Sequence, residues 1–218
     1  MNTKITKRKQ RILDVARESF YLRGYDETTF ELVAAQAETS TSLIRYHFED
    51  KASLAQQVYI HCLYELRDTY QEKAERLYPG VPFQVLSVAF SFALMDYFRA
   101  DRNALSFYFD TCANMLDRID SVLYSTYEEV LSKSQTDSVE PTQVQLSTIV
   151  SSFATVGLTK AFAEKTVDLD DESFFHYYFK INMLPFDLSE AEADTLFREA
   201  FSLYKKVYVA YLPNFCWE

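Results

Sequence analysis

Apolar residues recur at helical spacing from the start of the chain. Ile12, Ala16 and Phe20 lie four residues apart, which predicts a first helix over about residues 5–22. Gly24 follows it and supplies the left-handed backbone that commonly closes a helix. The first element is therefore expected to be a helix with one face in a core.

Two shorter helices follow, and each begins at a residue that can cap it. Thr28 precedes Glu31 by three residues, which is the spacing of a capping box and predicts a second helix that ends at residues 38–39. Ser40 can cap a third helix over residues 41–48. A tight turn is expected between these two helices.

The predicted third helix has two different faces. Ile44 and Phe48 lie on its apolar side. Its outer side carries groups that bond phosphates and bases, namely Thr41, Ser42, Arg45 and Tyr46. Two short helices joined by a tight turn, after a longer helix that braces them, can place the last helix in a DNA major groove. The pattern indicates a helix-turn-helix.

The rest of the chain also follows a helical pattern. Asp50 is a suitable N-cap for a long fourth helix, which continues to residue 77 before Pro79 and Gly80 end it. Five or six further helices are expected over residues 83–212. The polar or proline-marked breaks between them lie near residues 100–101, 132–141, 166–171 and 185–189. With only three glycines and five prolines in 218 residues, the turns of a large sheet are missing, and we expect an all-α fold.

Charge is distributed unevenly along the chain. The net charge of −10 argues at first against nucleic acid, because DNA binding is driven largely by Lys and Arg. Residues 1–51, however, carry nine Lys/Arg against eight Asp/Glu, whereas residues 52–218 carry 13 against 24. The first 23 residues hold seven basic and two acidic side chains. A basic arm on an acidic body is indicated, although a solvated lysine-rich terminus has the same composition.

The N-terminal residues resemble a known family. Gly24-Tyr25, the double threonine Thr28-Thr29, the Ala37-Glu38-Thr39-Ser40 turn and the tail from His47-Phe48 through Lys51 to Leu54 stand at its spacings. Over about residues 8–58 the chain is similar to the DNA-binding domain of the tetracycline-repressor (TetR-like) transcriptional regulators. The resemblance implies a DNA-binding domain over residues 1–52 and a helical effector-binding and dimerisation domain over residues 53–218.

The resemblance also implies which residues contact DNA. In that family the third helix reads the major groove and neighbouring residues bind phosphates. The positions in this chain are Thr29, Ser40, Thr41, Ser42, Leu43, Arg45, Tyr46, His47 and Lys51. Independently of the family, Lys51 at a helix N-terminus is expected to form an anion site. Tyr46 and His47 are each also compatible with packing inside the domain.

Two residues depart from the family pattern. Glu38 stands in the turn where the family commonly has glycine, and it brings a negative charge near the DNA. Arg45 stands where the family usually has an aromatic residue. Arginine can make two parallel hydrogen bonds to guanine O6 and N7. The sequence therefore predicts a guanine in each half-site of the DNA target.

The acidic body is rich in aromatic residues. Residues 52–218 hold 29 of the 35 Phe, Tyr and Trp side chains, more ring area than a narrow core stripe needs. The resemblance implies an effector pocket, and a dimer formed by helices at about 143–165 or 171–184 and 189–212. Candidate pocket residues, each also compatible with ordinary core, are Phe90, Met95, Phe98, Phe107, Tyr108, Cys112, Phe153 and Tyr178. Rings and carboxylates together suggest a small apolar or aromatic effector, with a cationic one as an alternative.

Other classes of protein lack their signatures in this sequence. No Ser/His/Asp or Cys/His order, glycine-rich phosphate loop or zinc-site spacing occurs, so we expect no enzyme, cofactor or metal. No run of 18 apolar residues occurs, so no membrane span is expected. No secretory signal occurs either, so we expect a cytoplasmic protein that is not exported. The prediction is a repressor that a small molecule releases from a palindromic operator. The alternative is a helical DNA-binding or interaction protein without effector control.

Overall fold

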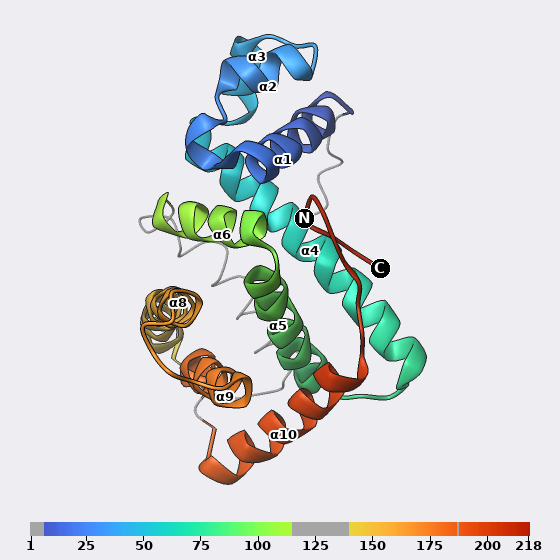
Figure 1. Ribbon diagram of the computed structural model, residues 1–218, viewed down its shortest axis with the longest axis vertical. Helices are drawn as coiled ribbons and strands as arrows, with labels where there is room; N and C mark the ends of the chain where they lie inside the picture. Colours follow the sequence, from blue (N-terminus) through green and yellow to red (C-terminus); the bar gives the residue numbers. More distant parts are fainter. Residues whose placement is uncertain (1–6, 115–139, 187) are drawn as a thin grey trace.

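The protein is built almost entirely of helices (Figure 1). The computed structural model describes residues 7–114, 140–186 and 188–218, so part of the expected break at 132–141 lies outside the described residues. The other predicted breaks, near residues 100–101, 166–171 and 185–189, all fall between observed helices. The prediction of an all-α fold is confirmed.

Three helices form a head at one end of the molecule (Figure 1). They are α1 (Lys7–Glu27), α2 (Phe30–Gln36) and α3 (Thr41–His47). Gly24 interrupts α1 with φ 82°, a backbone conformation that strains side-chain-bearing residues. The buried residues of the head include Ile12, Phe20, Val33, Ile44 and Phe48, and they are continuous with the core of the body.

One long helix joins the head to the body. Helix α4 (Lys51–Leu77) packs against α1 in the head and against α5 (Phe83–Ala100) and α6 (Arg102–Asn114) in the body. Its buried stripe includes Leu54, Val58, Cys62, Leu66 and Tyr70, each four residues after the one before. The expected domain boundary at residues 52 and 53 falls in the first turn of this continuous helix.

The body continues with α8 (Pro141–Ala163), α9 (Asp171–Asn182), a short 3₁₀ turn η1 (Leu184–Phe186) and α10 (Glu190–Lys206). Helix α10 lies along α5, and α8 packs against α9 and η1. Phe92 on α5 is fully buried and contacts the rings of Phe175, Phe197 and Phe201. Much of the aromatic excess of the sequence is therefore ordinary core.

The last predicted helix ends earlier than expected. The pattern suggested a helix to residue 212, but α10 ends at Lys206, and β1 (Tyr211–Leu212) pairs with β2 (Cys216–Trp217) in an antiparallel hairpin. Burial alternates after Lys206, since Val207 and Val209 are buried and Tyr208 is exposed. This period of two is typical of an extended strand and not of a helix. Pro213 also lacks the amide hydrogen that a helix needs.

One cap differs from the prediction. The side chain of Thr29, and not that of Thr28, accepts the hydrogen bond from Leu32 N that caps α2. Thr28 is buried and donates instead to Gly24 O at 2.8 Å. The capping box between Thr28 and Glu31 was therefore wrong by one position, because the threonine nearer the core serves the end of α1.

Helix α8 carries polar residues inside and apolar residues outside. Its buried face includes Thr148, Ser152 and Thr159, whose hydroxyls donate to carbonyls one turn earlier. By length and composition Thr142–Ala163 is a candidate membrane span, with mean hydropathy 1.3 and 28% of the window buried. The sequence-based expectation of no membrane span rested on the lack of an unbroken apolar run, a criterion that this helix does not meet although its mean hydropathy is high. Leu146, Val150 and Phe153 on this helix are exposed, whereas its other large apolar residues are buried or half-buried.

Candidate nucleic-acid interface

Helix α3 presents the two faces that the sequence predicted. Ile44 and Phe48 are buried, whereas Ser42, Arg45 and Tyr46 are exposed. Tyr46 is 80% exposed and touches the ring of His47 edge-on. Tyr46 is therefore not a packing residue in this structure, and the outer face of α3 is free to meet another molecule.

A hydrogen-bonded turn fixes the angle between α2 and α3. Thr39 N donates to Ala34 O at 2.9 Å and Glu38 N donates to Ala35 O at 3.4 Å, the two bonds of a Schellman motif. Glu38 occupies the left-handed position of this motif with φ 52°, where glycine is usual. The departure noted in the sequence is therefore a strained residue at the centre of the turn.

Two cations lie over rings at the edge of α3. The Arg45 guanidinium stands 5.0 Å from the centre of the Phe30 ring, and the Lys9 ammonium stands 5.3 Å from that of Phe48. Arg45 keeps an exposed position while its plane is restrained by α2. Sequence reasoning counted Lys9 in the basic arm without giving it a role, because only the fold brings α1 beside the end of α3.

Lys51 has a different environment from the one expected. Its ammonium donates to Tyr25 O at 2.9 Å and Asp26 O at 3.3 Å, and it lies 4.3 Å from the centre of the Tyr25 ring. The carboxylate of Asp50 caps α4 by accepting from Ser53 N at 2.7 Å. In this structure Asp50 caps the helix end and two carbonyls hold the Lys51 ammonium, and the anion site expected there stays a prediction.

The remaining sequence-predicted contacts surround the same face. Thr29 and Ser40 are exposed caps whose hydroxyls accept from Leu32 N and Leu43 N. Thr41, Leu43 and His47 are half-buried at the margin of the outer face. Ser40 thus begins the helix that carries the α3 residues, and Thr29 begins the neighbouring α2.

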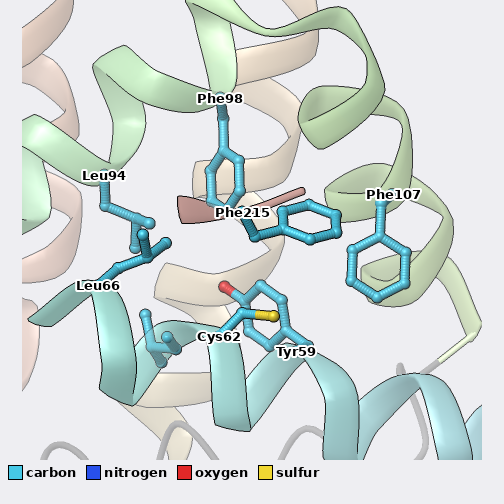
Figure 2. A pocket seen from close by; sticks show the side chains of 8 residues that line it. Tyr59, Cys62, Leu66, Leu94, Phe98, Phe107 and Phe215 are labelled. Carbon is cyan, nitrogen blue, oxygen red and sulfur yellow. The ribbon is translucent and has the colours of Figure 1, made fainter. Parts of the chain in front are cut away.

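The body contains a small apolar cavity between α4, α5, α6 and the C-terminal hairpin (Figure 2). About 10 Å³ is open to the centre of a water-sized sphere, roughly the room for one water molecule. Phe98 and Phe107 are the two predicted pocket residues that line it. Sequence reasoning missed the other lining residues, which are Tyr59, Cys62, Leu63, Leu66, Leu94 and Phe215.

Three further predicted pocket residues form a buried polar cluster next to this cavity. Tyr108 lies close enough to interact with Cys112, and burial raises the pKa of both groups, that of Cys112 to about 12. Burial also raises the pKa of Tyr178 to about 12, and its hydroxyl interacts with Ser91. Tyr59 of α4, whose pKa burial raises as well, is close enough to interact with them. These hydroxyls and the thiol are neutral at physiological pH.

The last three predicted pocket residues lie elsewhere. Phe90 packs on Tyr70 and Trp217, and Met95 is buried where its sulfur accepts from Thr159. Phe153 is 47% exposed on the outside of α8, so its assignment to a pocket was wrong. Its neighbours at helical spacing on α8 are themselves exposed, which the sequence pattern alone did not reveal.

An aromatic cage for a cation is present, but the chain fills it itself. The Arg99 guanidinium lies 4.3 Å and 4.8 Å from the ring centres of Phe162 and Phe174, and it pairs with Asp171. The residues that line the cavity include no carboxylate. The suggestion of a cationic effector therefore loses its support, while an apolar or aromatic one remains consistent with the lining. Among the described residues, no group of three His, Cys, Asp or Glu is arranged to hold a metal ion.

Taken together, α1, the short α2 and α3, and the turn between them define a helix-turn-helix DNA-binding domain on a helical body. The sequence model of the family described as bacterial regulatory proteins, tetR family, matches residues 12–58. These residues run from the core of α1 into the first turns of α4 and include all of α2 and α3. Over these residues the chain is similar to the DNA-binding domain of that family.

A curated relative and two solved structures are similar to the chain. An uncharacterized HTH-type transcriptional regulator, YhgD of Bacillus subtilis (strain 168), is 31% identical over 90 residues. That alignment covers 41% of this chain and 46% of the relative, so the chain spans about half the length of the relative it matches.

Both structures are more distant. The transcriptional regulator FadR from Bacillus subtilis, in complex with stearoyl-CoA, is 13% identical over 83% of this chain and 99% of that one, with TM-score 0.37. A gamma-butyrolactone receptor (ArpA-like protein) is 13% identical over 94% of this chain and 100% of that one, with TM-score 0.39.

Proposed function

We propose that the chain is a sequence-specific DNA-binding transcriptional regulator that reads a palindromic operator as a homodimer in the cytoplasm. The observation that carries this proposal is the outer face of α3, where Arg45 and Tyr46 stand exposed on a helix whose other face is buried. A helix of this kind fits the major groove of B-DNA, where all four base pairs are distinguishable.

On this proposal α3 reads bases and the residues around it bind phosphates. The base-reading set is Thr41, Ser42, Leu43, Arg45, Tyr46 and His47. The phosphate-binding set is Thr29, Ser40, Lys51 and, from the fold, Lys9. Thr29 and Ser40 accept hydrogen bonds within the head and keep their hydroxyl hydrogens for phosphate oxygens. Lys51 uses two carbonyls and has a third hydrogen to donate.

We propose that α8 pairs with α8 of a second copy. Leu146, Val150 and Phe153 are 60%, 56% and 47% exposed and follow one another at intervals of four and three residues, with exposed Gly157 continuing the strip. Contiguous exposed apolar residues of this kind mark interaction surfaces, and a two-fold dimer uses one patch twice. Helix α10, by contrast, already gives its apolar face to α5.

The dimer also follows from the size of a DNA site. One recognition helix covers only a few base pairs, so two helices about 34 to 36 Å apart are needed to select a site among many. A second copy related by two-fold symmetry presents two such helices to the two arms of a palindrome. We infer repression because a dimer on a promoter blocks polymerase sterically.

We further propose that a small apolar or aromatic molecule controls DNA binding through the body, which begins near residue 53. The cavity beside Phe98 and Phe107 is apolar, and polar hydroxyls stand next to it. Ligand pockets usually measure about 300 to 1,000 Å³, so the body must open to admit an effector. The small cavity also supports the second candidate, a helical DNA-binding or interaction protein without effector control.

The test is selection of bound fragments from random duplex DNA by the full chain, followed by sequencing. A palindrome with a guanine in each arm and its arms one helical turn apart is the expected result. Tyr46→Ala should reduce the enrichment, whereas Tyr64→Ala, which changes an exposed tyrosine on α4, should leave it intact. A wild-type chain that enriches no motif, or whose affinity depends on salt and not on sequence, contradicts the proposal.

A further inference from the structure

The chain ends in a segment that returns from the far end of the body to the head. We call residues 207–218 the C-terminal strap. Figure 1 shows it, in red, running from α10 back toward α1. Its hairpin is closed by two backbone hydrogen bonds, from Ala210 N to Glu218 O at 2.8 Å and from Glu218 N to Ala210 O at 3.1 Å. The strap is thus an ordered element with a fixed path.

One residue of the head holds the tip of the strap. The Arg17 guanidinium, on α1, donates to Asn214 O at 2.8 Å and to Phe215 O at 2.5 Å. It also pairs with Glu65 on α4. Because a guanidinium presents several donors in a rigid plane, Arg17 joins head, strap and linking helix at one point.

The other side of the strap is attached to the body. Tyr211 donates its hydroxyl hydrogen to Asp96 on α5 at 2.9 Å, and Lys73 on α4 donates to Glu218 O at 3.1 Å. Trp217 is buried against the rings of Tyr70 and Tyr97. The strap therefore connects the head to the body along a path separate from the α4 backbone.

Phe215 links this connection to the cavity. Its side chain is buried between the rings of Tyr21 and Phe107, at 5.2 Å and 5.1 Å, and lines the cavity with Cys62 and Leu66 (Figure 2). Its own carbonyl is one of the two that Arg17 holds. A molecule that enlarges the cavity on its Phe215 side would displace the ring of the residue whose carbonyl Arg17 holds.

The strap is also held in a conformation of raised energy. Asn214 and Phe215 have φ values of 63° and 56°, in the left-handed region that is unfavourable for side-chain-bearing residues, less so for asparagine. Asn214 Oδ1, Trp217 Nε1 and the Tyr70 hydroxyl are buried without a hydrogen-bond partner among the described residues. Each costs stability relative to a paired group. The buried rings of the strap stabilise its packing on the body, whereas its left-handed backbone and its unpaired polar atoms destabilise that packing.

We propose that the C-terminal strap is a releasable connection that fixes the head on the body. A planar apolar molecule entering the cavity beside Phe215 displaces that ring, frees Arg17 and lowers the affinity of the head for DNA. The strap thereby supplies the coupling between effector and DNA that the proposed function requires, and the inference rests on that function. Coupling of this kind is reciprocal, so DNA binding in turn holds the strap closed.

Trp217 makes the strap directly observable, because it is the only tryptophan in the 218 residues. The experiment measures acrylamide quenching of its fluorescence and affinity for the selected operator, in the full chain and in Arg17→Met. We expect Arg17→Met to increase the quenching constant at least twofold and to weaken operator binding about tenfold, which corresponds to about 1.4 kcal/mol. Operator DNA should reduce quenching in the wild-type chain.

Two variants serve as controls. Lys73→Met removes a contact between strap and body without touching the head, so operator affinity should stay within twofold of wild type. Glu65→Gln removes the ion pair and leaves both carbonyl contacts of Arg17, so it should weaken binding far less than Arg17→Met does. Circular dichroism verifies that each variant is folded. If Arg17→Met is not, Phe215→Leu, which shortens the ring at the cavity, replaces it and should give the same two changes.

Several results would overturn the inference. If Trp217 becomes more accessible while operator affinity is unchanged, the strap only stabilises the fold. If Glu65→Gln matches Arg17→Met in affinity, the ion pair and not the strap positions the head. A wild-type chain that selects no DNA sequence contradicts the proposed function instead. In that case unchanged quenching in Arg17→Met would still show that Arg17 does not hold the strap.

Discussion

At the scale of single residues, the head combines a buried core with a few side chains in unusual environments. Tyr46 is almost fully exposed, Arg45 lies over the Phe30 ring, and Glu38 adopts a left-handed backbone. Lys51, expected on phosphate, is bonded to the carbonyls of Tyr25 and Asp26. Each of these environments has a measurable consequence.

Arg45→Ala should relax base preference at one position of each half-site. A bidentate contact to guanine discriminates by about 1 to 3 kcal/mol, so the penalty for replacing that guanine should fall by this amount in the variant. The measurement compares the affinity of wild type and variant for the selected operator and for operators changed at each guanine. Equal weakening on every sequence would make Arg45 a phosphate contact.

Glu38→Gly should stabilise the head and strengthen DNA binding. Glycine relieves about 1 to 2 kcal/mol of left-handed strain and loses about 0.4 to 1 kcal/mol through the freer unfolded chain, so a net gain of about 0.5 to 1 kcal/mol is expected. The variant also removes a negative charge beside α3. Chemical denaturation measures the first effect, and Glu49→Gln, an exposed charge nearby, controls for the second. A less stable Glu38→Gly chain would contradict the strain argument.

The free energy of unfolding should fall at alkaline pH, because a buried thiol ionises less readily in the folded chain than in the unfolded one. Burial raises the pKa of the Cys62 thiol from 9.0 to about 12. Above pH 9 the thiol ionises in the unfolded chain but not in the folded one, so rising pH favours unfolding. At pH 10 this group alone should cost about 1.4 kcal/mol. Denaturation at pH 8 and pH 10 measures the loss, which Cys62→Ala should reduce; an unchanged difference in that variant would refute the assignment.

At the scale of elements, the placement of apolar and polar faces decides which helices remain available for partners. Helix α10 turns its buried residues toward α5, whereas α8 buries serines and threonines and leaves Leu146, Val150 and Phe153 exposed. The strip on α8 runs at helical spacing and is narrow enough to pair with a copy of itself. Its polar inner face suits a helix that packs on α9 more than one surrounded by lipid.

Val150→Glu should convert the proposed dimer to a monomer. A charge in the middle of the strip would be buried against its two-fold mate, so dimer affinity should fall at least tenfold, which is about 1.4 kcal/mol or more. Sedimentation velocity over a concentration series measures the change. Gln145→Glu adds the same charge to α8 beside the strip and should leave the dimer intact. A Val150→Glu chain that remains dimeric would move the interface to another face.

At the scale of the whole molecule, the head and the body differ in net charge and are joined by several contacts. Residues 1–51 carry a net charge of +1 and residues 52–218 one of −11, so the proposed DNA partner would be repelled by the body and not by the head. Helix α4, the packing of α1 on α6 and the C-terminal strap all connect these ends. Movement in the body therefore has several routes to the reading helix, and the strap is one of them.

Lys9→Ala should weaken binding to every DNA sequence alike. If Lys9 neutralises one phosphate, the slope of log affinity against log salt should become shallower by about one unit, with base preference unchanged. Titrations at salt concentrations between about 50 and 200 mM give this slope. Lys206→Ala, at the end of α10, is the matched control and should leave it unchanged. A change in base preference in Lys9→Ala would exclude a role limited to phosphate.

The sequence by itself determined the local features of this protein. Helical spacing, the Ser40 and Asp50 caps and the scarcity of glycine predicted the order of the helices, and motif spacing predicted the helix-turn-helix and its outer face. These features depend on residues three or four apart, so a linear pattern contains them. The one-residue error at Thr28 arose where a second, tertiary use of the side chain competed with capping.

Only the tertiary structure decided which long-range partner each side chain meets. In the folded chain Lys51 bonds to backbone carbonyls and Phe153 is exposed. Arg99 lies among aromatic rings, and Phe215 lines a cavity beside α4. Arg17 and the carbonyl of Phe215 are 198 residues apart in sequence. Contacts at that separation depend on how every intervening helix packs, and no local spacing records them.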